Sequence, residues 1–66
     1  MKITANSKDF EIQEALTVAE FITRMALNPA RCVVELNSAA LRFEQFKNIT
    51  LKDGDNLEIM QVVAGG

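Results

Sequence analysis

A single segment with helical periodicity lies between segments that alternate like strands, and this order restricts the fold more than any other feature of the sequence. Thr17-Val18-Ala19-Glu20 has the spacing of a capping box, in which the threonine and glutamate side chains each accept from a free backbone N–H. A helix is therefore expected to begin there. Arg24 lies four residues after Glu20, and this spacing predicts an ion pair between the two side chains. Pro29 disfavours helical angles in the residue before it, so the helix is expected to end near Leu27. The apolar stripe of this helix, expected to pack on a sheet, consists of Val18, Phe21, Ile22 and Met25.

Two short alternating runs precede the helix. In the first, Ile3 and Ala5 alternate with polar neighbours, and in the second, Phe10 and Ile12 do the same. The polar residues 6–9 separate the two runs. This pattern predicts an N-terminal β-hairpin.

Further strand signals follow the helix. Residues 32–36 are apolar and β-branched with one charge at Glu35, which predicts a central strand covered on one face. Asn37-Ser38 is a natural turn, and residues 39–46 are ambiguous between a short strand and a helical turn. The Asp53-Gly54 pair tolerates positive φ in a tight turn, so the last strand is expected to start near Asn56.

The parity of the last strand predicts its two faces. Leu57 and Ile59 are expected to face the core, while Glu58, Met60 and Val62 point to the other side. Together the elements predict an α+β domain over residues 1–63, with one main helix across one face of a mixed, four- to five-stranded sheet. This is the element order of the ubiquitin-like β-grasp fold.

The composition argues against several function classes. The 66 residues include no histidine, so an imidazole base and the usual zinc ligand sets are excluded, and we expect neither a metal site nor autonomous catalysis. Cys32 is the only cysteine, which excludes an internal disulfide and fits a reducing cytoplasm. Seven scattered basic residues against nine acidic ones predict no nucleic-acid binding. No stretch approaches the roughly 20 apolar residues that cross a bilayer, so no membrane association is expected.

The last three residues carry the most direct indication of chemistry. Ala64-Gly65-Gly66 follows an apolar run, and we expect these residues to form a flexible tail. The two glycines carry no Cβ, so this arm can pass through a slot too narrow for a side chain. The carboxylate of Gly66 is therefore the candidate reactive group, although a domain cut at a linker would end in the same way.

Several of these features occur together in one known family. Three segments carry a resemblance: the Leu36-Asn37 turn, the Asp53-Gly54-Asp55 turn and the ending Gln61-Val62-Val63-Ala64-Gly65-Gly66. Together with a β-grasp order over 66 residues, they resemble the ThiS family of sulfur carriers. The resemblance covers the whole chain. One departure is Leu41-Arg42-Phe43, a segment in which family members often carry a Pro-Arg pair.

The resemblance implies a role as a protein co-substrate. It implies that a ubiquitin-activating-type adenylyltransferase uses ATP to adenylate Gly66, and that the carrier binds no cofactor stably. It further implies that a cysteine desulfurase or another persulfide donor supplies sulfur, giving a C-terminal thiocarboxylate that thiazole synthase uses in thiamine biosynthesis. Two alternatives remain open: a carrier for molybdopterin, cysteine or metallophore synthesis, and a ubiquitin-like binding or conjugation module.

A carrier must be held by its partner while its tail reacts. Met60 and Val62, expected to face away from the helix beside the tail, are the candidate partner-binding residues, with cover for a neighbouring strand or a dimer contact as the alternative. Cys32 is interpreted as a small packing residue rather than a sulfur relay. Asp53 and Asp55 are interpreted as turn residues rather than catalytic carboxylates.

Overall fold

The N-terminal alternation forms the predicted hairpin in a computed structural model, which describes residues 1–63 of the chain. Strands β1 (Lys2–Ala5) and β2 (Lys8–Glu11) pair antiparallel around Asn6 and Ser7. Both turn residues have positive φ, the pattern of a two-residue type I′ turn, whose twist matches that of the flanking strands. The connection between the two strands is therefore shorter than the predicted segment 6–9, because Lys8 and Asp9 belong to β2.

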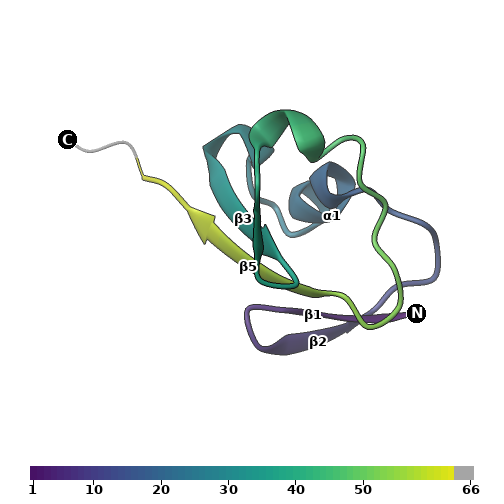
Figure 1. Cartoon of the computed structure of the whole chain (residues 1–66). Helices are drawn as coiled ribbons and strands as arrows, with labels where there is room; N and C mark the ends of the chain where they lie inside the picture. Colours follow the sequence, from purple (N-terminus) through teal and green to yellow (C-terminus); the bar gives the residue numbers. More distant parts are fainter. Residues whose placement is uncertain (64–66) are drawn as a thin grey trace.

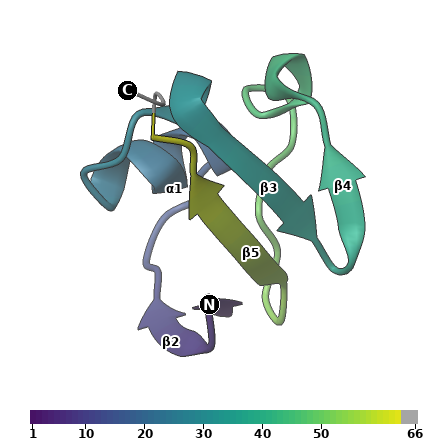
Figure 2. The ribbon, with the colours of Figure 1, turned by 90° about the vertical axis from the view of Figure 1, so that its left-hand side faces the viewer.

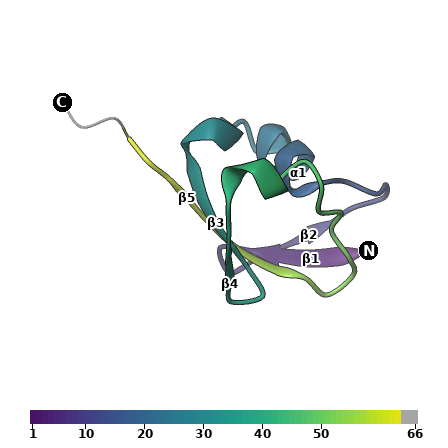
Figure 3. The same ribbon diagram turned by 45° about the horizontal axis from the view of Figure 1, so that its top comes forward.

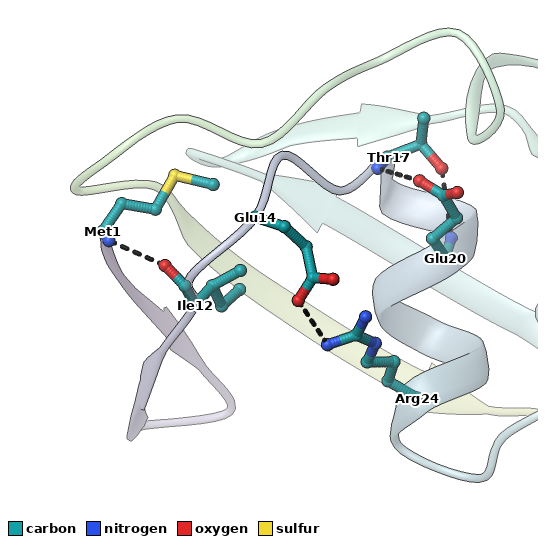
Figure 4. A network of polar contacts seen from close by, with 6 residues as sticks. All are labelled: Met1, Ile12, Glu14, Thr17, Glu20 and Arg24. Atoms are coloured by element: carbon teal, nitrogen blue, oxygen red, sulfur yellow. Dashed lines mark hydrogen bonds and ion pairs between the residues drawn. The ribbon is translucent and has the colours of Figure 1, made fainter.

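Helix α1 (Val18–Arg24) begins at the predicted capping box. The Glu20 N–H donates to Thr17 Oγ1 at 3.1 Å, and the Thr17 N–H donates to Glu20 Oε1 at 2.8 Å (Figure 4). The predicted end near Leu27 is wrong, because α1 stops at Arg24. Ala26 adopts a φ of 63°, and the Leu27 N–H donates to the Ile22 carbonyl at 3.2 Å. These features form a Schellman motif, in which the left-handed residue ends the helix.

The predicted ion pair between Glu20 and Arg24 is also wrong. Arg24 Nη1 donates instead to Glu14 Oε1 at 2.9 Å, and Glu14 lies in the loop that precedes the helix (Figure 4). Glu20 is occupied by the capping box at the first turn. The hydrogen bond from Arg24 lowers the pKa of Glu14, and the same contact raises the pKa of Arg24.

The second half of the chain supplies three strands and two short helical turns. The 3₁₀ turn η1 (Pro29–Arg31) leads into β3 (Cys32–Leu36), which pairs antiparallel with β4 (Ala39–Leu41) around Asn37 and Ser38. The ambiguous residues 39–46 contain both expected structures, because η2 (Phe43–Gln45) follows β4. Gly54 has a φ of 88° in the predicted tight turn, and β5 (Asn56–Gln61) starts at the predicted residue.

The five strands form one mixed sheet in the order β2-β1-β5-β3-β4 (Figure 2). Strand β5 is central: it runs parallel to β1 and antiparallel to β3. Helix α1 lies across one face of this sheet, as Figures 1 and 3 show from two directions. Within residues 1–63 no helix covers the other face. The predicted ubiquitin-like β-grasp architecture is therefore confirmed.

The core fills the space between α1 and the sheet. Its fully buried side chains include Val18 and Ile22 from the helix and Ile3, Val34 and Leu57 from the strands. Phe46, which directly follows η2, is also buried. The other buried apolar residues are Ala5, Ile12, Leu16, Phe21, Leu51 and Ile59. None of the helices in residues 1–63 has the length and apolar character needed to cross a bilayer.

Candidate functional site

Strand β5 carries the chain from the centre of the sheet toward the C-terminus (Figure 1). Its register with β3 sets Met60 opposite Val33 and Gln61 opposite Cys32. One residue past the strand, the Val62 N–H donates to the Arg31 carbonyl at 2.6 Å. The backbone is therefore held to its neighbour up to Val62, two residues before Ala64, where the expected reactive tail begins.

Asn6 fixes the other side of β5 with its side chain. Its Oδ1 accepts from the Ile59 N–H at 2.7 Å, and its Nδ2 donates to the Ile59 carbonyl at 2.9 Å. Strand β1 ends at Ala5, so this amide continues the hydrogen-bond ladder past the end of the backbone pairing. Sequence reasoning missed this role, because it depends on a contact between residues 53 positions apart.

An exposed apolar surface lies beside the end of β5. Met60 and Val62 are 68% and 50% exposed, and Leu57 and Ile59 are buried, so the predicted strand parity is confirmed. Val33, opposite Met60 on β3, is 53% exposed and extends this surface. We call Val33, Met60 and Val62 the outer apolar patch. Val33 was missed, although the exposed position of Glu35 two residues later indicates the outer face of the same strand.

The three residues proposed to carry the chemistry, Ala64, Gly65 and Gly66, lie outside the described residues. The structure does describe how the chain reaches them. Val63 is 81% exposed and follows a strand that is hydrogen-bonded on both sides. The arrangement is thus a hydrogen-bonded strand with an apolar patch beside its last residues.

In a comparison with protein families, the model of the ThiS family matches residues 1–66. The chain belongs to the ThiS family. The resemblance inferred from the tail and the turns is therefore confirmed.

Solved structures agree with the ThiS assignment. A crystal structure of the thiamine biosynthesis protein ThiS from Geobacter metallireducens is similar with a TM-score of 0.82 and 33% identity, over 100% of both chains. A solution structure of a thiamine biosynthesis protein from the same organism has a TM-score of 0.80 and 35% identity, over 100% of this chain and 88% of that one. The "uncharacterized protein ycf40" of Porphyra purpurea is 29% identical over 66 residues, which are 100% of this chain and 93% of the relative.

Cys32 of this ThiS-family chain is a packing residue. Its side chain is partly buried and packs against the core, and Sγ donates to the Asn28 carbonyl at 3.3 Å. Burial raises the pKa of the Cys32 thiol, which disfavours the nucleophilic thiolate. The geometry agrees with the packing interpretation.

The two aspartates of the ThiS-type Asp-Gly-Asp turn bind backbone groups. Asp53 Oδ1 accepts from the Lys2 N–H at 2.7 Å, and Asp55 Oδ2 accepts from the Lys52 N–H at 2.8 Å. Asp55 thus closes the turn, as predicted, whereas Asp53 ties the turn to the start of β1. Within residues 1–63 no group of three or more His, Cys, Asp or Glu side chains is arranged to hold a metal ion.

Proposed function

We propose that this chain is a sulfur carrier in thiamine biosynthesis whose reactive group is the carboxylate of Gly66. Membership of the ThiS family over residues 1–66 supports this role, as does the similarity to a ThiS crystal structure. The observation that carries the proposal is the anchored strand β5, which ends beside the outer apolar patch and leads into Ala64-Gly65-Gly66. ThiS-family proteins are carriers rather than catalysts.

The proposed chemistry starts from an unreactive carboxylate. The α-carboxyl group of Gly66 is ionised at neutral pH, and an anion resists nucleophilic attack until its oxygen becomes a good leaving group. A ubiquitin-activating-type adenylyltransferase supplies that group: the carboxylate oxygen attacks the α-phosphate of ATP, pyrophosphate leaves, and an acyl adenylate forms. ATP belongs to the partner, so the carrier itself needs no stable cofactor.

Sulfur then replaces the adenylate. The terminal sulfur of a persulfide, supplied by a cysteine desulfurase or another donor, attacks the acyl carbon, and AMP leaves. A thiol cleaves the resulting acyl disulfide, which gives the thiocarboxylate on Gly66 and a disulfide on the donor. Thiazole synthase is the proposed acceptor of this sulfur. The single, partly buried thiol of Cys32 supports a reducing cytoplasmic location and leaves the sulfur chemistry to the partners.

Mass spectrometry of the intact protein tests the proposal. Incubation with the adenylyltransferase from the same genome, Mg-ATP and a persulfide donor is expected to replace one terminal oxygen by sulfur. The matched control is the same chain with one alanine added after Gly66, which moves the carboxylate past the reactive position and leaves the fold intact by circular dichroism. Normal sulfur loading of the extended chain would contradict the assignment of Gly66. An isopeptide adduct in place of a thiocarboxylate would favour a conjugation module.

A further inference from the structure

Two glutamates face each other on the uncovered side of the sheet. Glu35 of β3 lies directly opposite Glu58 of β5, two positions along from the facing pair of Val33 and Met60. Both carboxylates are on exposed residues. Like charges directly opposite each other across an antiparallel pair destabilise a sheet, so folding alone does not explain this pair.

The described part of the chain gives these carboxylates no counter-ion. The nearest basic residue on this face by strand register is Arg42, which directly follows Leu41 of β4 and so comes opposite Val33; its Nε lies 3.9 Å from Glu44 Oε2. The other ion pairs within residues 1–63 join the Met1 amino group to Glu11, Lys2 to Asp9, and Arg24 to Glu14. Glu35 and Glu58 thus have no ion-pair partner within the described residues.

The carboxylates border a shallow depression that also contains apolar surface. It has a volume of about 270 Å³ and is lined by Val33, Glu35, Glu58, Ile59 and Met60. Its apolar end is continuous with the outer apolar patch, because Val33 and Met60 belong to both. A long side chain with an apolar stem and a cationic head matches both ends of this depression.

We propose that the adenylyltransferase places an arginine side chain in this depression, with its methylene groups on Val33 and Met60 and its guanidinium between Glu35 and Glu58. This inference rests on the proposed function, since the enzyme that acts on Gly66 must cover the surface beside the tail. Arginine fits better than lysine, because its planar head has five donors and can bridge two carboxylates. A second copy of this chain fits poorly, because a two-fold contact through this face brings four carboxylates together.

Binding measurements on neutralised variants test the proposal. Wild type, Glu35→Gln, Glu58→Gln and the double variant are titrated with the adenylyltransferase at low and high salt, and Kd is measured by calorimetry. We expect the double variant to bind at least about tenfold more weakly at low salt, and the difference to shrink at high salt because the contact is screened. Glu14→Gln, which removes the same charge from the loop before α1, is the matched control and is expected to bind like wild type.

A second measurement separates docking from folding. Neutralising Glu58 removes a repulsion, so the Tm of Glu58→Gln is expected to rise by about 1 to 5 °C. A fall in Tm would mean that the carboxylates stabilise the fold. An unchanged Kd in the double variant would mean that no cation of the enzyme binds them. Either result overturns the inference. Absence of wild-type binding, or a wild-type dimer that buries this face, would also overturn it.

Sulfur loading is read separately from binding. If Gly66 is loaded while the double variant binds like wild type, the proposed function stands and the arginine contact is wrong. If the variants lose binding while wild type is never adenylated, the contact is supported and the proposed function is wrong.

Discussion

Residues 59 and 60 are neighbours in β5 with opposite surroundings, which makes them a direct test of the register. Ile59 is 7% exposed and Met60 is 68% exposed. Ile59→Asp buries an unpaired charge and is expected to cost about 3 kcal/mol or more, a large part of the stability of a small domain. Met60→Asp is expected to stay within about 1 kcal/mol of wild type. Urea unfolding followed by circular dichroism measures both, and the reverse ranking would mean that the register is shifted by one residue.

Ala26 is the other residue with a distinctive environment. It holds a left-handed conformation, with φ of 63°, at the position of the Schellman motif where glycine is preferred. A Cβ makes this conformation costly, so Ala26→Gly is expected to stabilise the fold by about 0.5 to 1 kcal/mol.

Ala30→Gly is the control for this substitution. Ala30 lies in η1, which lacks a positive φ, so glycine there is expected to destabilise through the entropy of the unfolded chain. Thermal unfolding of both variants distinguishes them. Equal effects at the two positions would contradict the interpretation of the helix end.

At the scale of elements, the Asn6 side chain joins the first hairpin to β5. Asn6→Gly keeps the positive φ of the turn but removes both hydrogen bonds to Ile59, and is expected to cost about 1 to 3 kcal/mol. Ser7→Gly changes the other residue of the same turn and is expected to have a small effect. Amide hydrogen exchange at Ile59 is the specific measurement: it should accelerate in Asn6→Gly and not in Ser7→Gly. Unchanged exchange in Asn6→Gly would contradict a role in holding β5.

The elements that were predicted correctly depend on local sequence. The capping box at Thr17, the Asn37-Ser38 turn and the Asp53-Gly54 turn each combine residues whose side chains or φ preferences act within a few positions. Strand parity in β5 is equally local, since alternate residues face opposite sides. These signals were sufficient for the element order and for the exposure of Met60 and Val62.

The features that were missed depend on contacts between distant segments or on unusual backbone. The helix end at Arg24 depends on left-handed Ala26, a residue type that gives no stop signal. Arg24 binds Glu14 because the loop before α1 folds toward the helix. Val33 joins the outer apolar patch only through the register of β3 with β5. The predicted tail, residues 64–66, lies outside the described residues and stays a prediction.

At the scale of the whole molecule, one face of the sheet packs against α1, and no helix within residues 1–63 covers the other (Figure 1). Met60→Asp is expected to leave the domain folded and to weaken binding to the adenylyltransferase about tenfold or more, because a charge entering an apolar contact must be desolvated. Phe43→Asp is the matched control: Phe43 is 56% exposed and lies with Phe46 on the helix side. Calorimetric titration of both variants measures the difference. Equal weakening by the two changes would contradict docking through the outer apolar patch.

The parallel pairing of β1 with β5 has a mechanical consequence. If the molecule is pulled between Met1 and Val63, the two strands are loaded along their length, and the bonds from Thr4 to Asp55 and from Asn6 to Leu57 must stretch together. If the two terminal strands were antiparallel, the same force would break their hydrogen bonds one after another. Forced unfolding is governed by the height of the barrier to separation, and simultaneous rupture raises it. The sheet is therefore expected to resist extension between Met1 and Val63 more strongly than a sheet with an antiparallel terminal pair would.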